Sequence, residues 1–333
     1  MKNFDINYVC VSSRVRIARN LDSRLTFNTS EAGAFNAVAE TIKRRNKDFL
    51  GVEVKGLSSE MAKSLFERHL ISKELLKNKK NSLIVVRKDN KVCVMLGEED
   101  HIRIQSIHTG LAVRRAYDDS KNVADDIAAE HKLAFRDDFG FLTSCLTNLG
   151  CAMRASVMIF LPALTLTGNI DSIEERFRNE RITVRGLYGE GSEAGGYMYQ
   201  ISNQACLGMS EQSIIENVEA VAIQLSKMEL ELQQRLFQDD PDAITDQVYR
   251  SWGILTNALV LSSSEAVDHL AMLKLGACLD IIRLKNNQEL DNLFFLIQPA
   301  TLVTQDDRAS SVSARDKIRA AKVSEVLRHS RIK

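Results

Sequence analysis

The spacing of apolar residues changes abruptly after Gly208, and this change constrains the fold more than any other feature of the chain. Beyond that point, apolar side chains recur every three or four residues along one face of a long predicted helix that begins at Ser210: Ile214, Val218, Val221, Ala222, Leu225, Met228, Leu232 and Leu236. The acidic, proline-containing segment 238–243 ends this helix. Further helices are predicted at 243–261, 264–284, 287–297 and 313–329, and Ser262 and Glu265 have the spacing of a capping box. The pattern therefore predicts two domains, 1–237 and a helical C-terminal domain at 243–333.

The first domain mixes strand and helix patterns. Two segments rich in β-branched residues, 82–87 and 91–96, flank a turn-forming Lys-Asp-Asn and predict a hairpin. Strands are also expected at 12–19, 139–146, 182–188 and 198–204, and a helix at 123–135. Sequential strands joined by short turns favour an α+β fold, in which helices flank an antiparallel sheet, over repeated βαβ units.

Composition narrows the class of protein. The 333 residues include 44 Lys and Arg and 44 Asp and Glu, so no overall charge directs the chain to nucleic acid or to an anionic membrane. The longest strongly apolar run, 157–164, is too short to cross a bilayer. The six cysteines form no CxxC pair, so their spacing indicates neither a zinc site nor a disulfide framework. We expect a cytoplasmic protein that binds neither nucleic acid nor membrane.

Arginines in four separate segments are the candidate anion ligands. Arg14 and Arg16 are two apart, so on a strand their side chains point to the same face. Arg103, Arg154 and Arg185 lie in the other three segments. Guanidinium groups pair bidentately with phosphate oxygens and stay charged at ordinary pH, which suits a nucleotide triphosphate. Separate surface ion pairs are the alternative, and the residues alone do not bring the five into one pocket. Neither the P-loop pattern nor the glycine-rich signature of the common protein kinases is present.

The segments SSRVR (12–16), GEEDHIR (97–103), TSCLTNLGCAMRAS (143–156) and VRGLYGEGSE (184–193) resemble the signature segments of the ATP:guanidino phosphotransferases. The resemblance implies the antiparallel catalytic fold of that family and ATP as phosphate donor, with Mg²⁺ held mainly by phosphates and waters. It also implies a phosphate-binding cradle formed by Arg14, Arg16, Arg103, Arg154 and Arg185, with His69 near the adenine.

The same resemblance assigns the acceptor side of the site. Glu99 matches the catalytic glutamate of the family, Glu190 matches its second guanidinium-binding carboxylate, and Cys145 matches its reactive thiol. Many relatives have proline where this chain has Leu146, next to that thiol. In isolation, the acidic cluster would be read as a solvated turn and the cysteine as a packing residue. Two carboxylates can hold one guanidinium through charge-assisted hydrogen bonds and accept its proton.

Two features resemble the bacterial protein-arginine kinases within this family. The SSRVR segment begins at Ser12, whereas a helical domain precedes it in animal arginine and creatine kinases, so the site is expected to admit an arginine of a macromolecule. The run RDKIRA (315–320) matches an element associated with phosphoarginine sensing, and the matching residues are Arg315, Asp316 and Arg319. On a helix, the two arginines are four residues apart and share a face. An ordinary charged surface helix is the alternative.

The resemblance implies an enzyme that phosphorylates arginine side chains of proteins in a bacterial stress response, marking them for a Clp-type protease. It further implies an activator protein, a transcriptional repressor as a partner, and a homodimer formed through the C-terminal domain. Two alternatives stay open: a free-arginine (phosphagen) kinase, and a catalytically inactive adaptor that binds phosphoarginine through 315–320.

Overall fold

The computed structural model describes residues 6–22, 32–77, 79, 82–186 and 195–332. Its central feature is an eight-stranded sheet with the strand order β2-β3-β4-β5-β1-β8-β10-β9, in which every neighbouring pair is antiparallel. The strands are β1 (Cys10–Arg19), β2 (Phe49–Glu53), β3 (Leu83–Arg87), β4 (Val92–Leu96), β5 (Ile102–Thr109), β8 (Met153–Phe160), β9 (Ile182–Gly186) and β10 (Met198–Asn203). The α+β fold expected from the sequence is confirmed.

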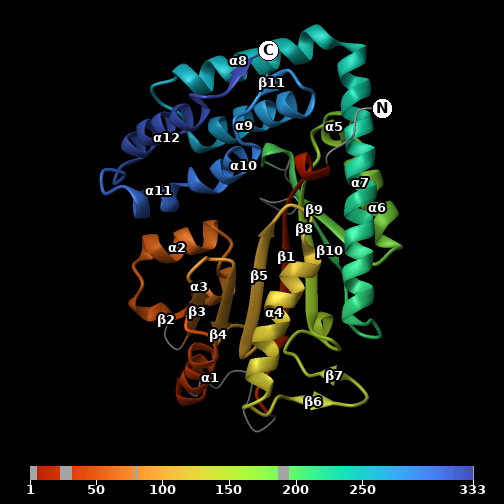
Figure 1. The fold of residues 1–333 in the computed structure, drawn as a ribbon, viewed down its shortest axis with the longest axis vertical. Helices are drawn as coiled ribbons and strands as arrows, with labels where there is room; N and C mark the ends of the chain where they lie inside the picture. Colours follow the sequence, from red (N-terminus) through yellow and green to blue (C-terminus); the bar gives the residue numbers. More distant parts are fainter. Residues whose placement is uncertain (1–5, 23–31, 78, 80–81, 187–194, 333) are drawn as a thin grey trace.

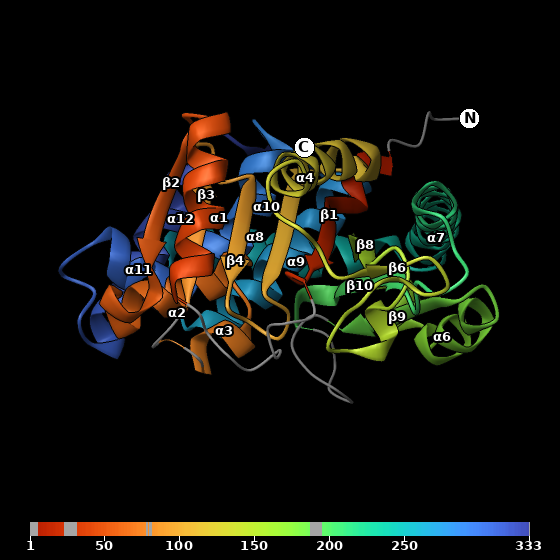
Figure 2. The same ribbon diagram turned by 90° about the horizontal axis from the view of Figure 1, so that it is seen from below.

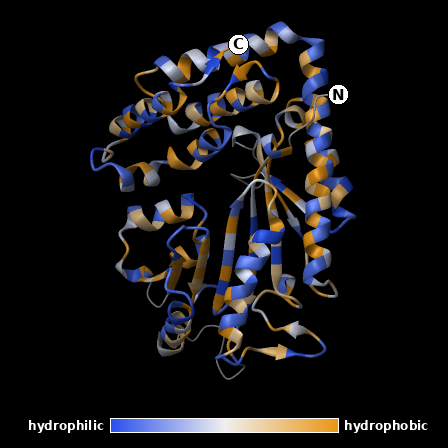
Figure 3. Cartoon of the chain, in the orientation of Figure 1, coloured by the Kyte–Doolittle hydropathy of each residue, from blue (hydrophilic) through white to orange (hydrophobic). Residues whose placement is uncertain are grey.

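Helices cover one face of this sheet. The covering helices are α1 (Ala32–Arg45), α4 (Val113–Ala128), α6 (Ile170–Arg178) and α7 (Glu211–Asp239), with the short α5 (Pro162–Leu166) beside α7. Alternate strand residues such as Val15, Ile17 and Val157 point to this side and are fully buried in one apolar core. Figure 2 shows α1 and α4 on the same side of the strands. Hydrophobic and hydrophilic residues alternate along α4 and α7, as expected for helices with one buried face (Figure 3).

Two shorter helices, α2 (Ser59–Glu67) and α3 (Lys73–Lys77), pack with β3 and β4 around a smaller apolar cluster that contains Cys93 and Met95. These two strand residues belong to the opposite face of the sheet, because their neighbours Val92 and Val94 point into the main core. The opposite face is therefore only partly covered, and most of its middle is left for polar side chains.

The C-terminal helices gather at one end of the sheet (Figure 1). They are α8 (Pro241–Asn257), α9 (Ser263–Cys278), α10 (Asn287–Leu296), α11 (Pro299–Gln305) and α12 (Val312–Leu327), accompanied by a small pair of strands, β11 (Ile282–Arg283) and β12 (Arg331–Ile332). Their apolar core also includes Met158, Phe160 and Met198 of the large sheet. The capping box of Ser262 and Glu265 is confirmed at the start of α9.

Several predicted elements were wrong in extent; the helix predicted at 243–261, for example, ends at Asn257. The helix predicted at 123–135 ends at Ala128, because the backbone of the following residues pairs with the segment after β1: Ala134 N donates to Asn20 O at 2.8 Å. The strand predicted at 139–146 is limited to β7 (Gly140–Phe141), which pairs with β6 (Phe135–Arg136). The helix predicted at 264–284 ends at Cys278, since Asp280 has a φ of 65° and β11 follows.

Across the described stretches of the chain, no helix is both long and apolar enough to cross a membrane.

Candidate functional site

The strand register brings all five candidate arginines to one face of the sheet. Arg14 and Arg16 of β1 point away from the core that holds Val15 and Ile17. Arg16 lies directly opposite Arg154 of β8, and Ala18, on the same face of β1 as Arg16, lies opposite Arg103 of β5. Arg185 of β9 lies directly opposite Gln200 of β10, so the two side chains point to the same face of the sheet. The structure therefore gathers residues that the sequence places in four distant segments.

This arginine cluster is electrostatically unfavourable without an anion. Like charges directly opposite one another on neighbouring strands are destabilising, and Arg16 and Arg154 form such a pair. Burial, together with Arg103 and Arg154, lowers the pKa of Arg14 to about 10. Burial and the neighbouring guanidinium groups, beginning with Arg14, lower the pKa of Arg16 well below its usual range. A bound polyanion would reverse both effects.

Two polar residues of β10 orient the cluster. An Nη of Arg14 donates to Oε1 of Gln200 at 2.8 Å, and an Nη of Arg154 donates to Oγ of Ser202 at 2.8 Å. Within the described ranges, Nε of Arg14 and Nε of Arg154 are buried and have no hydrogen-bond partner. A buried N–H group without a hydrogen bond costs free energy. A ligand that accepts hydrogen bonds from these two groups would remove that cost.

An acidic turn faces the arginines. It follows the confirmed hairpin of β3 and β4 and contains Glu98, Glu99 and Asp100. Glu98 forms an ion pair with Arg103. Asp100 is buried, and its carboxylate accepts hydrogen bonds from the side chain of Asn20 at 2.8 Å and from the backbone N–H of Ser144 at 2.7 Å. The second bond fixes the segment that carries Cys145 beside the turn.

Glu99 is left exposed at the tip of this turn. Its side chain lines a cavity of about 270 Å³ together with the side chains of Cys145, Arg16, Arg103 and Arg154. Partial desolvation against the cavity wall, followed by the charges of Asp100 and Glu98, raises the pKa of Glu99. A carboxylate with a raised pKa is a better proton acceptor than an ordinary surface glutamate. The cavity thus combines a base, a thiol and three guanidinium groups.

Cys145 lies immediately before a 3-10 turn at Leu146–Asn148, and its Sγ is 3.0 Å from Oγ1 of Thr147. Leu146 is the first residue of this turn and is 79% exposed, so it makes no contribution to the core. Cys145 itself is partly exposed and stands at the wall of the cavity.

A second cavity, of about 190 Å³, adjoins Arg14 and is mainly apolar. Val11 and Met158 contribute to its lining, together with His69 and Phe295 of α10. Burial, with the nearby charge of Arg14, lowers the pKa of His69 to about 4, so its ring is neutral at pH 7. In the part of the chain that the structure describes, the buried Nε2 of His69 has no hydrogen-bond partner.

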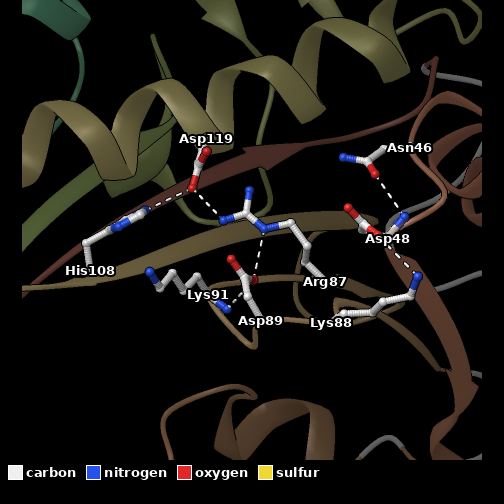
Figure 4. A network of polar contacts seen from close by, with 8 residues as sticks. All are labelled: Asn46, Asp48, Arg87, Lys88, Asp89, Lys91, His108 and Asp119. Atoms are coloured by element: carbon white, nitrogen blue, oxygen red, sulfur yellow. Dashed lines mark hydrogen bonds and ion pairs between the residues drawn. The ribbon is translucent and has the colours of Figure 1, made fainter.

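A network of ion pairs joins β3 and β5 to α4 (Figure 4). Arg87 at the end of β3 donates to Asp119 of α4 at 2.8 Å and to Asp89 of the following turn at 2.9 Å. Nε2 of His108, a residue that borders the cavity, lies 2.9 Å from the same Asp119 oxygen. Burial lowers the pKa of His108 and outweighs the effect of Asp119. The network fastens β3 and β5 to α4 and so fixes the strands beneath the cavity.

The remaining predicted residues lie elsewhere. Glu190 is outside the described residues. Helix α12 carries Arg315, Asp316 and Arg319. These three residues are close to one another and are distant in sequence from the arginine cluster. Arg319 is buried and donates to the carbonyls of Leu261 at 2.6 Å and Ile297 at 3.0 Å, and also to Asp316 at 2.5 Å. Arg315 is partly exposed, and its guanidinium donates at long range to the backbone carbonyls of Ala309 and Ser310.

Among the described residues, no group of three or more acidic, histidine or cysteine side chains is arranged to hold a metal ion.

Comparison with known proteins identifies the family. The family described as ATP:guanido phosphotransferase, C-terminal catalytic domain, matches residues 31–232, and that described as protein-arginine kinase McsB C-terminal domain matches residues 241–332. A protein named protein-arginine kinase from Caldanaerobacter subterraneus subsp. tengcongensis is 39% identical over 302 residues, which cover 88% of this chain and 89% of that protein. The protein of the same name from Bacillus licheniformis is 38% identical over 96% of this chain and 90% of its own length. The chain belongs to the protein-arginine kinase branch of the ATP:guanido phosphotransferases.

Solved structures show the same fold as this family member. Lombricine kinase has a TM-score of 0.59 and 21% identity, and the match covers 69% of this chain and 68% of that one. The duplicated taurocyamine kinase from Schistosoma mansoni with bound transition state analog components has a TM-score of 0.61 and 25% identity, covering 75% of this chain and 38% of that one.

Four residues near the site of this guanido phosphotransferase were not found from the sequence. Gln200 and Ser202 alternate on β10, and that period of two was the available signal. Glu74 of α3 lines the cavity of Glu99, and Phe295 of the C-terminal region lines that of His69. No pattern in the sequence indicates either contact, because both arise from packing between distant elements.

Proposed function

We propose that this protein transfers the γ-phosphate of ATP to arginine side chains of proteins. The observation that supports this most strongly is the meeting of five guanidinium groups on one face of the sheet with Glu99 at its edge. The crowded guanidinium groups of Arg14 and Arg16, whose pKa values are lowered, favour a bound polyanion, and a carboxylate with a raised pKa beside them suits a basic acceptor. The relatives named protein-arginine kinase supply the acceptor: an arginine of a protein.

In the proposed reaction, the arginines seat the triphosphate and Glu99 orients the acceptor guanidinium. A terminal nitrogen of the acceptor attacks the γ-phosphorus in line, and the bond to the oxygen that bridges the β and γ phosphates breaks. ADP leaves with the electron pair of that bond. The acceptor nitrogen loses one proton to the Glu99 carboxylate, so that the product is an N-phosphorylated guanidinium whose positive charge is outweighed by the two negative charges of its phosphoryl oxygens.

Each remaining side chain has a defined task in this proposal. Arg16, Arg103 and Arg154 stabilise the charge that spreads over the transferred phosphoryl group. Glu190 is the second carboxylate proposed to bind the acceptor guanidinium, and Cys145 lies at the wall of the same cavity as Glu99. Arg14 and Arg185 hold the outer phosphates, and His69 lies beside the base. Mg²⁺, when bound with the nucleotide, would neutralise phosphate charge.

We further propose that the chain comprises a catalytic domain at 1–237 and a helical domain at 243–333, and that the protein acts in the cytoplasm as a homodimer. The residues Arg315, Asp316 and Arg319 are proposed to sense phosphoarginine, with the partly exposed Arg315 as the group that reaches the ligand. A stress-response role, an activator protein, a Clp-type protease and a transcriptional repressor as partners are proposed from the family resemblance.

The test is an incubation with ATP and Mg²⁺ and either an unfolded arginine-rich protein or free arginine. We expect phosphate on protein arginines, stable at neutral pH and lost in acid, as read by phosphosite mass spectrometry under non-acidic conditions. Glu99→Gln should lower the rate by about 10²-fold or more, the usual contribution of a positioned base, whereas Glu216→Gln on the exposed side of α7 should leave it unchanged.

The outcome also separates the alternatives. Phosphate on free arginine but not on protein would identify a phosphagen kinase and refute the proposal. Binding of phosphoarginine without any ATP-dependent transfer would refute it in favour of an adaptor.

A further inference from the structure

The cavity beside Arg14 is bounded by two regions that are distant in the sequence. His69 follows α2 directly, with a left-handed φ of 57°, and Phe295 lies near the end of α10 in the C-terminal region. Their rings meet edge to face, with centroids 5.4 Å apart and planes inclined by 76°. The rest of the lining includes Val11 and Met158. An apolar slot with an aromatic wall, opening beside a phosphate-binding arginine, has the chemistry of a purine site.

We propose that Phe295 contacts the base of ATP, and that Glu67 is a positioning residue that holds Phe295 there. The C-terminal helical region then forms part of the nucleotide site. This inference rests on the proposed function, because it assumes that the arginine cluster receives the phosphates of a nucleotide.

Glu67 fastens α2 to the segment that follows α10. It is the last residue of α2, and its carboxylate accepts three hydrogen bonds from the start of α11. The donors are the backbone N–H of Ala300 at 2.9 Å, the backbone N–H of Thr301 at 2.7 Å and Oγ1 of Thr301 at 2.8 Å. Since a carboxylate at a helix start is stabilised by these N–H groups, the contact is stronger than an ordinary surface hydrogen bond.

A second contact holds the other end of α10. Gln288 in its first turn donates to Oγ1 of Thr109 at 2.9 Å, and Thr109 is the last residue of β5 and borders the cavity. Helix α10 is thus held at its start by β5 and just beyond its end by α2 through Glu67. One contact joins the sheet and the other joins α2 to the C-terminal region, and together they fix the distance between Phe295 and His69.

The proposal predicts that the base and the phosphates are recognised by separate groups. Phe295→Leu keeps an apolar side chain but removes the ring. It should raise the KM for ATP by about ten-fold, which is within the range for losing an aromatic contact to a base. Inhibition by inorganic tripolyphosphate, which has no base, should stay as in the wild-type protein. The KM for the arginine substrate should also be unchanged.

Glu67→Gln tests the positioning role, with Glu60→Gln in the exposed first turn of α2 as the matched control. We expect Glu67→Gln to raise the KM for ATP several-fold at nearly constant kcat, and Glu60→Gln to leave both constants unchanged. An unchanged KM for ATP in Phe295→Leu, or an equal weakening of ATP and tripolyphosphate, would overturn the inference. Calorimetric binding of ADP to the same variants gives the answer even if the wild-type protein transfers no phosphate, so the two proposals can fail separately.

Discussion

Replacing Arg14 by methionine should stabilise the protein in the absence of ATP and abolish the stabilisation that ATP provides. A pKa lowered to about 10 means that keeping this guanidinium charged in the folded state costs about 3 kcal/mol. The folded-state pKa lies below the unfolded-state value, so this cost would be relieved only as pH rises above about 10. At neutral pH it is present in full.

Two effects reduce the gain. Arg14 is not fully enclosed, so solvent screens part of the repulsion, and removing it deprives Gln200 of a hydrogen bond worth about 1 kcal/mol. We therefore expect Arg14→Met to raise the free energy of unfolding by about 1–2 kcal/mol, or Tm by a few degrees.

The assay is thermal and urea unfolding at pH 7, with and without saturating ATP and Mg²⁺. Wild-type protein should gain Tm on adding the nucleotide, whereas Arg14→Met should gain little. Arg250→Met serves as the control, since Arg250 is exposed on α8 and its loss should change stability by less than about 0.5 kcal/mol. If Arg14→Met were less stable than wild type without nucleotide, the view that the arginine cluster is an uncompensated anion site would be wrong.

Three further predictions concern the loops and the pH profile. Gly196→Ala should lower the free energy of unfolding by about 1–3 kcal/mol in urea titrations, because its φ is 66° and a Cβ would approach the Val267 side chain to 2.9 Å; an unchanged midpoint would contradict this packing. Leu146→Pro should raise the free energy of unfolding by about 0.4–1 kcal/mol and leave kcat unchanged, because the preceding residue is already extended and Leu146 begins a turn. A lower free energy of unfolding would show that the turn cannot accommodate proline. Glu98→Gln should move the acidic limb of the kcat/KM profile to lower pH, because it removes one charge that raises the pKa of Glu99; a limb that stays in place would exclude Glu99 as the titrating group.

The parts of the fold that follow a local pattern could be predicted from the sequence. The hairpin before Glu98, the helix that begins after Ser210 and the capping box of Ser262 each depend on residues close together in the chain. Their side-chain periods of 2 and 3.6 are set by the backbone itself, so neighbouring residues are sufficient to indicate them.

The elements that were wrong depend on distant partners. After Ala128 the sequence still resembles a helix, but its backbone is paired with the segment after β1. The residues around Ser144 resemble a strand, but the backbone N–H of Ser144 is bound by the carboxylate of Asp100. In both places tertiary hydrogen bonds outweighed the local preference.

The candidate site divides in the same way. The sequence indicates that Arg14 and Arg16 share a face, and the family resemblance adds Arg103, Arg154 and Arg185. Only the register of β1 against β8 shows that Arg16 and Arg154 are directly opposite each other. The contribution of Phe295 depends on how the C-terminal helices pack against the sheet, which no local pattern determines.

A structure of the protein with ADP and Mg²⁺ is the most direct test of the central claim. The account predicts the phosphates among Arg14, Arg16, Arg103 and Arg154 on the open face of the sheet, within hydrogen-bond distance of those guanidinium groups and facing Glu99. Phosphates bound on another surface, away from these arginines, would contradict it.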